Sequence, residues 1–187
     1  MQQSRLLLVS GSLRAASTNT ALLRTAQTAA PDGIETTMFE GMAALPHFNP
    51  DDDAEGAPVH PAVATLREAI AAADAVMVST PEYAGALPGS FKNLLEWTVG
   101  DGGLYRKPVA WLNAAGPASP TGAADAYASL RKVLGYVNAQ VVEEACVNVP
   151  VERSQIGADG LIADANVRTL VAKALALLTR APRGDAA

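Results

Sequence analysis

Short polar side chains gather in residues 11–20, directly after an apolar run that predicts a strand. Hydroxyl and amide donors stand there with one arginine: Ser12, Arg14, Ser17, Asn19 and Thr20. A helix is expected to begin at the end of this segment, and the free N–H groups and dipole of a helix N-terminus favour an anion. With Gly11 allowing a sharp turn, the segment indicates a phosphate-binding loop, although it contains neither a P-loop lysine nor GxGxxG. The alternative is that Ser17 or Thr18 only caps the helix.

A second loop of this kind follows the buried run at residues 75–80. Pro81 and Gly85 break the strand there. The loop holds Glu82, Tyr83 and Ala84 between them. Its backbone groups could face a planar heterocycle, with the Tyr83 ring as an aromatic wall. The alternative is an ordinary strand-to-helix turn, in which the Glu82 carboxylate is solvated or caps a helix.

A third loop follows the apolar run at residues 107–113. It contains Ala115 and Gly116, whose small size would let a flat ligand approach the backbone. A plain turn explains these residues equally well, so the third loop alone does not indicate a site.

The alternation of strands and helices along the chain positions these loops. Apolar runs predict strands at residues 6–10, 34–39, 75–80, 107–113 and 141–149, and five helical patterns alternate with them. Such alternation predicts an α/β fold, a three-layer sandwich whose five-stranded parallel sheet has helices on both faces. The count fits the flavodoxin-like strand order 2-1-3-4-5, which leaves a cleft where strands 1 and 3 diverge. We therefore expect the first and second loops to flank that cleft.

Length and charge narrow the class of protein. The 187 residues are expected to form one domain at residues 1–179, with a disordered tail at 180–187. The net charge of −5 argues against a nucleic-acid or anionic membrane partner. No apolar run approaches the roughly 18 residues that span a bilayer, and the N-terminus does not resemble a signal peptide. We expect a cytoplasmic protein.

Metal and thiol chemistry are not indicated. The one cysteine, Cys146, lies in a strand-like run and is expected to be a buried, inert thiol. The chain has two histidines, which makes a histidine-rich metal site improbable. An irregular stretch at residues 40–60 is long enough to be a functional loop. Its acidic run at 51–53 is expected to be solvated rather than to bind a metal.

Taken together, the motifs resemble the NADPH-dependent FMN reductase family of flavodoxin-like quinone, azo-dye and chromate reductases. The resemblance covers residues 4–175 and rests on Gly-Ser-Leu-Arg with Ser17 and Asn19, and on Pro-Glu-Tyr with Gly85, Pro88, Lys92-Asn93 and Trp97. It implies FMN as the cofactor. The implied cofactor-binding residues are Gly11, Ser12, Arg14, Ser17, Asn19 and Thr20 for the phosphate, Pro81, Glu82, Tyr83, Ala84 and Gly85 for the isoalloxazine, and Ala115 and Gly116 for its other edge.

Two positions depart from the family pattern. The family often has asparagine where this chain has Ala84, so backbone contacts would replace a side-chain contact. The third loop often has several glycines in the family, whereas here it reads Gly-Pro-Ala-Ser-Pro.

The resemblance implies an FMN-dependent oxidoreductase. Hydride would pass from NAD(P)H to flavin N5, and electrons would then reach a small acceptor such as free flavin, a quinone, an azo compound or a metal oxyanion. This mechanism assigns no catalytic side chain and no metal. A flavodoxin-type electron carrier without NAD(P)H activity is the alternative, and a flavin-free interaction domain is a third hypothesis. The Gly-Ser-Leu-Arg motif and the modest charge favour the enzyme.

Two questions stay open at this level. The candidate cations for a 2′-phosphate of NADPH are Arg14, Arg106 and Lys107, and the sequence does not choose among them. The resemblance implies a homodimer or homotetramer, with residues 40–60 and the helix beginning at Pro88 as the expected interface.

Overall fold

The structure is a computed structural model that describes residues 3–54, 56 and 58–182. Within them, one sheet contains the strands β1 (Ser4–Ser10), β2 (Ile34–Phe39), β3 (Ala75–Ser79), β4 (Pro108–Asn113), β5 (Gln140–Val141) and β6 (Val147–Asn148). The order is β2-β1-β3-β4-β5, with β6 also paired to β4, and every pairing is parallel. The expected order 2-1-3-4-5 is confirmed.

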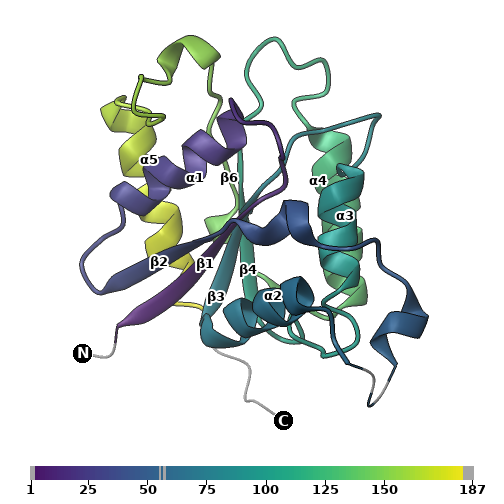
Figure 1. Ribbon diagram of the computed structural model, residues 1–187. Helices are drawn as coiled ribbons and strands as arrows, with labels where there is room; N and C mark the ends of the chain where they lie inside the picture. The colour runs from purple at the N-terminus through teal and green to yellow at the C-terminus, as the bar shows by residue number, and fades with distance from the viewer. Residues whose placement is uncertain (1–2, 55, 57, 183–187) are drawn as a thin grey trace.

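Helices cover both faces of this sheet (Figure 1). They are α1 (Thr18–Thr28), α2 (Pro61–Ala72), α3 (Gly89–Glu96), α4 (Ala124–Tyr136) and α5 (Ala165–Leu178). Helices α1 and α5 pack on one face, and α2, α3 and α4 pack on the other. The expected flavodoxin-like three-layer sandwich is confirmed. Among the described residues, no helix combines the length and apolar character needed to cross a membrane.

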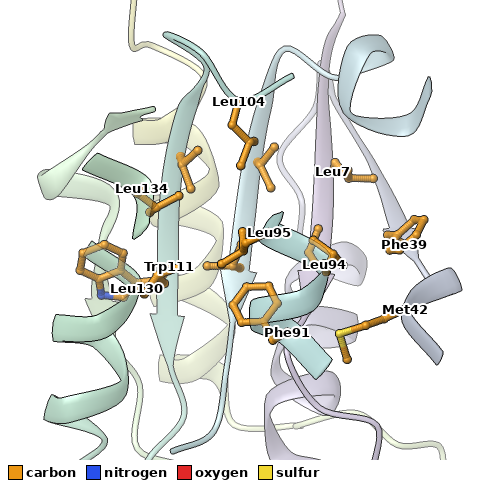
Figure 2. Packing of buried hydrophobic residues seen from close by; sticks show 14 of the residues in the cluster. Leu7, Phe39, Met42, Phe91, Leu94, Leu95, Leu104, Trp111, Leu130 and Leu134 are labelled. Carbon is orange, nitrogen blue, oxygen red and sulfur yellow. The ribbon is translucent and has the colours of Figure 1, made fainter. Parts of the chain in front are cut away.

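The sheet has a hydrophobic core on each face, which explains why the sequences of its strands are unbroken apolar runs. Successive side chains of a strand point to opposite faces, so a parallel strand between two helix layers is apolar at every position. In β1, Leu6 and Leu8 pack with α1 and α5, whereas Leu7 and Val9 pack on the other side. Figure 2 shows the second of these cores, where Leu94 of α3 lies over the sheet.

The fifth strand differs from its prediction. The run at residues 141–149 is not one strand, because a 3₁₀ turn at Glu143–Ala145 separates β5 from β6. The turn buries Ala145 and leaves Glu143 exposed, where its carboxylate pairs with Arg131. Strands β5 and β6 form the last strand position of the sheet and pair only with β4. The break between them therefore leaves no other strand without a partner. The apolar pattern was consistent with burial, but it did not reveal the break.

The connections at the carboxyl ends of β1, β3, β4 and β6 gather along one edge of the sheet (upper edge in Figure 1). In open α/β sheets this is the edge where ligands bind. The opposite edge carries the beginnings of the strands, including Arg106 and Lys107 immediately before β4. Of the expected disordered tail at 180–187, residues 183–187 lie outside the described residues.

Candidate functional site

A cleft of about 540 Å³ opens at the carboxyl edge of the sheet. This volume lies within the range of small-molecule and cofactor sites. Four segments form its walls: the first turn of α1, the chain after β3, the chain after β4, and the chain after β6. The lining residues are Thr18, Asn19, Thr80, Pro81, Glu82, Ala114, Ala115, Gly116, Pro117, Ala118, Ser119, Pro120, Thr121, Ala123, Val151, Glu152 and Arg153. The cleft therefore joins parts of all three loops singled out in the sequence.

The first loop ends in a capped helix. The Ser17 side chain accepts a hydrogen bond from the Thr20 backbone N–H at 3.3 Å, and the Thr20 hydroxyl lies 2.7 Å from the Ser10 hydroxyl. Ser17 thus caps the helix, and a contact between Ser17 and a phosphate stays a prediction. The N–H groups of Thr18 and Asn19 lie in the same first turn, where no preceding turn supplies carbonyl partners. These two residues line the cleft, so the helix dipole favours an anion there.

Gly11 is required for a reason other than a turn. A Cβ atom at this position would lie 2.7 Å from Thr80 Cβ and 2.9 Å from Phe91 Cδ1, both too close for real atoms. The Gly11 N–H also donates to the Ser79 carbonyl at 2.8 Å. The first loop therefore lies directly against the end of β3, and only glycine permits this approach.

A buried hydrogen-bond network lies beneath the cleft. The Ser79 hydroxyl lies 2.8 Å from Asn19 Oδ1 and 2.7 Å from the Leu112 carbonyl, and its single proton serves both acceptors. The Tyr127 hydroxyl donates to the same Leu112 carbonyl at 2.9 Å. Burial raises the pKa of Tyr127 far above its ordinary value, so its hydroxyl stays protonated. The network joins α1, β3, β4 and α4 at the points where the loops leave the sheet.

The second loop contains a tight two-residue turn. The backbones of Tyr83 and Ala86 exchange two hydrogen bonds of 3.1 Å, and Ala84 and Gly85 between them have φ values of 51° and 70°. Two consecutive positive φ angles are the signature of a type I′ turn. A Cβ on Gly85 would meet nothing within 4 Å, so the turn, not a nearby protein atom, requires this glycine.

The Glu82 carboxylate caps a helix, which is the alternative that the sequence left open. It accepts hydrogen bonds from the Asp125 and Ala126 N–H groups at 3.0 and 3.2 Å, at the start of α4. The Thr121 hydroxyl bond is the main reason that the pKa of Glu82 lies below its ordinary value, and these N–H bonds lower it further. Glu82 also lines the cleft, although its charge is already hydrogen-bonded.

Asn113, at the end of β4, holds the third loop in place. Its amide nitrogen donates to the Gly122 carbonyl at 2.8 Å, and its amide oxygen accepts from the Ala115 N–H at 3.0 Å. Gly116 lies close to the chain after β6, since a Cβ there would be 3.0 Å from the Val151 carbonyl. The sequence interpretation overlooked Asn113 because it reads as the last residue of a buried strand.

The structure separates the sequence-predicted residues into three groups. Asn19, Pro81, Glu82, Ala115 and Gly116 line the cleft. Ser17 and Thr20 line a neighbouring depression of about 330 Å³. The walls of the cleft do not include Gly11, Ser12, Arg14, Tyr83, Ala84 or Gly85. The part that each residue takes in binding a cofactor stays a prediction.

The sequence interpretation did not identify the residues after β6 as part of the site. Val151, Glu152 and Arg153 line the cleft, and Arg153 also lines the neighbouring depression. The signal that could have found them was their position after the last strand, since the ends of all parallel strands meet at one edge. The sequence interpretation considered only the loops after the first, third and fourth strands.

One expectation about charged residues is wrong in part. Asp51 and Asp52 are exposed, as expected, but the Asp53 side chain is 8% exposed and pairs with Arg67 Nη2 at 2.7 Å. Arg106 and Lys107 precede β4, at the edge opposite to the cleft, and the Lys107 ammonium donates to the Ile70 and Ala73 carbonyls at 2.7 Å each. These two residues are therefore not candidates for the 2′-phosphate. The described part of the chain contains no group of three or more His, Cys, Asp or Glu arranged to hold a metal.

Helix α3 and the residue that follows it hold the long loop at Pro46 and Phe48. The Asn93 amide nitrogen and Trp97 Nε1 both donate to the Pro46 carbonyl, at 2.8 and 2.9 Å, and the Phe48 N–H donates to Asn93 Oδ1 at 2.7 Å. The motif residues Asn93 and Trp97 thus hold the loop and lie outside the walls of the cleft.

Comparison with protein families gives one match. Residues 4–153 fit the sequence model of a family described as NADPH-dependent FMN reductase. The match spans both motif loops and ends at Arg153, so it covers each segment that lines the cleft.

Individual proteins agree with that match. The chain is 33% identical to an NAD(P)H-dependent FMN reductase of Pseudomonas aeruginosa over 181 residues, which cover 94% of this chain and 95% of the relative. It is 34% identical to a quinone reductase of Escherichia coli over 137 residues, or 72% and 71% of the two chains. A solved structure of FerB, a flavoenzyme NAD(P)H:(acceptor) oxidoreductase from Paracoccus denitrificans, superposes with a TM-score of 0.72 at 27% identity, covering 94% and 97% of the chains.

Proposed function

The chain belongs to the NADPH-dependent FMN reductase family, and we propose that the cleft at the carboxyl edge of its sheet is where FMN and NAD(P)H meet. The protein is an NAD(P)H-dependent oxidoreductase with FMN as its cofactor. The assignment of the reaction to this cleft, the roles of individual residues and the acceptor are our proposals. One observation supports the location above all: the first turn of α1 and the loops after β3 and β4 line a single cleft.

The residues of the cleft fit the chemistry of FMN. An anionic group suits the first turn of α1, where Thr18 and Asn19 lie in the wall. Away from that end, part of the wall consists of small or rigid residues, among them Pro81, Ala115 and Gly116. A flat ring can approach the backbone closely at such residues, because few side-chain atoms stand in its way. The cleft thus combines a helix N-terminus, which carries a partial positive charge, with a wall segment that suits a flat ring.

In this proposal the protein binds and orients. Bound FMN would supply the redox chemistry, which is acceptance of a hydride from a nicotinamide and transfer of the electrons to an acceptor. The network of Asn19, Ser79 and Tyr127 holds the loops at a fixed spacing. The Glu82 carboxylate fixes the second loop to α4 and has its charge hydrogen-bonded, so we assign it no proton transfer. No side chain of the cleft is required as a nucleophile or base.

Anaerobic titration of the purified protein tests this function. Addition of NADPH, and separately of NADH, should bleach the flavin absorption without any partner reductase. A protein that retains FMN but is not bleached by either nucleotide would be a carrier of the flavodoxin type. A protein that purifies without flavin, and does not take up added FMN, would contradict the proposed cleft.

We propose a small quinone or free flavin as the electron acceptor, in the cytoplasm. Support comes from the relatives described as a quinone reductase and an FMN reductase. Steady-state oxidation of NADPH with a soluble benzoquinone, and then with free FMN, would rank the two acceptors. We further propose that residues 1–179 act as one domain.

We also propose that the chain forms a homodimer or homotetramer. Residues 42–48 of the long loop and α3 form a groove of about 610 Å³, which Leu13 also lines with 56% of its surface exposed. Burial of this surface against a second copy would remove apolar area from water. Size-exclusion chromatography with light scattering tests the proposal, and Leu13→Glu should shift the protein toward the monomer.

A further inference from the structure

We infer that the depression beside the cleft binds the 2′-phosphoadenosine end of NADPH, with Arg24 and Arg153 on the 2′-phosphate. This inference rests on the proposed function, because it names the donor that the same site prefers. The depression has a volume of about 330 Å³ and lies between the first turns of α1 and the chain that follows β6.

The two arginines come from distant parts of the chain. Arg24 projects from α1, two turns after the Ser17 cap, and Arg153 stands in a 3₁₀ turn at Arg153–Gln155. Both residues line the depression. Arginine binds phosphate with two parallel N–H donors, so a pair of them is suited to a phosphate dianion.

Neither guanidinium is neutralised by a strong partner. In the part of the chain that the structure describes, the Arg153 side chain makes no hydrogen bond or ion pair. Arg24 Nη2 lies 3.6 Å from Glu40 Oε1, and these side chains are 50% and 75% exposed. An exposed pair at that distance contributes little and can open for a ligand. By contrast, Arg67 and Arg131 are held by carboxylates, so they are not available in this way.

The other walls of the depression fit a purine. Ala16, Ile156 and Ala158 present apolar surface, and Gly160 leaves the backbone open. A flat heterocycle can lie on such surface, and the planar guanidinium of arginine also stacks on aromatic rings. A depression lined by apolar residues and two arginines therefore suits a purine nucleoside that carries a phosphate. Inorganic phosphate would use only the arginines.

Arg153 connects the depression to the cleft, since it lines both. A dinucleotide is long enough to occupy two neighbouring sites at once. With its nicotinamide in the cleft, NADPH would direct its adenosine past Arg153. NADH lacks the 2′-phosphate, so it would not make the charge-assisted contacts with the two arginines. The depression would thus set the preference between the two donors.

Kinetics of the FMN-loaded protein test the inference. Arg153→Gln and Arg24→Gln should each raise KM for NADPH by roughly tenfold or more, the cost of one charge-assisted contact. Arg24 lines the depression and is not in the wall of the cleft, so Arg24→Gln should leave kcat, KM for NADH and the FMN content nearly unchanged. Arg106→Gln is the matched control, because it removes the same charge from the opposite edge of the sheet. Equal effects on NADH and NADPH, or loss of FMN instead, would overturn the inference.

Calorimetry separates this inference from the proposed function, because it needs no turnover. The FMN-loaded protein should bind adenosine 2′-monophosphate more tightly than adenosine or inorganic phosphate, and Arg153→Gln should abolish the difference. If inorganic phosphate binds as well as the nucleotide, the depression is a simple anion site and the inference is wrong. Failure of NAD(P)H to bleach the flavin would instead contradict the proposed function, while the nucleotide titration would still decide the role of the depression.

Discussion

The Glu82 carboxylate accepts a hydrogen bond from the Thr121 hydroxyl at 2.7 Å, which joins the loop after β3 to the loop after β4. The two residues lie on adjacent walls of the cleft. With the N–H groups at the start of α4, this bond makes one carboxylate the link between both loops. The contact therefore couples the shape of the cleft to the ionisation of Glu82.

Stability should depend on pH through this residue. The Thr121 hydroxyl bond lowers the pKa of Glu82 below its ordinary value. A carboxylate with a lowered folded-state pKa stabilises the fold above its unfolded pKa, and this contribution disappears as the pH falls through the folded value. Glu82→Gln should therefore lower the unfolding temperature at neutral pH, and the variant and the original protein should converge in acid, below the ordinary range of glutamate. Glu35→Gln, at an exposed carboxylate of β2, is the control. A difference independent of pH would contradict this assignment.

Ala84→Asn should stabilise the protein by about 0.5–1 kcal/mol. Ala84 has φ of 51°, a left-handed conformation that costs an alanine roughly 1 kcal/mol and that asparagine adopts more readily. Urea unfolding followed by circular dichroism would measure the change. Ala44→Asn, at an exposed alanine without a positive φ, should show no such gain.

Gly85→Val should greatly reduce FMN retention while the sheet stays folded. Gly85 has φ of 70° in the tight turn, and a β-branched residue would distort that turn at a cost of roughly 1–2 kcal/mol. The ratio of flavin to protein absorbance after purification measures retention. Gly33→Val is the matched control, because Gly33 has φ of 83° and equally open surroundings but precedes β2 at the far edge. If both variants retain FMN equally, the turn does not contribute to the flavin site.

Arg14→Ala should weaken FMN binding by roughly 1.5–3 kcal/mol and leave riboflavin binding unchanged, because only FMN carries a phosphate. The Arg14 side chain is exposed and has no ion pair among the described residues, so it is available to a ligand. Quenching of flavin fluorescence by the apoprotein would give both affinities. Equal losses for both flavins would place Arg14 elsewhere.

Ser17→Ala gives the control for this measurement. Ser17 caps α1, so its loss should cost about 1 kcal/mol of stability. If FMN affinity is unchanged in this variant, Ser17 only caps the helix. The loss of FMN affinity in Arg14→Ala is then due to a lost contact with the phosphate.

Cys146 should be unreactive and dispensable. Burial raises the pKa of its thiol to about 11, so the reactive thiolate is scarce at neutral pH. Alkylation by iodoacetamide should be slow at neutral pH and accelerate in strong alkali. Cys146→Ala and treatment with a chelator should both leave NADPH oxidation nearly unchanged. A collapse of activity in either case would show that the mechanism uses a thiol or a metal.

The amino-acid sequence alone determined the alternation of strands and helices, except for the break between β5 and β6, and this alternation fitted the strand order that the sheet has. Runs such as Leu6–Leu7–Leu8 are apolar at consecutive positions, and this local pattern suffices to identify a strand buried on both faces. The positions of Pro81 and Gly85 also marked the second loop correctly. Local sequence carries this information because secondary structure depends on the spacing of apolar residues and on the backbone freedom of glycine and proline.

Only the tertiary structure decided which of these residues meet. Glu82 binds the start of α4, 43 residues away, and Arg153 comes from the far end of the chain to stand beside α1. Arg106 and Arg153 are indistinguishable as isolated arginines, yet they lie at opposite edges of the sheet. Their separation follows from the direction of the strands: a residue before β4 and a residue after β6 end up at opposite edges because both strands run parallel. Contacts between residues so distant in sequence depend on how the whole sheet is assembled, which no local pattern records.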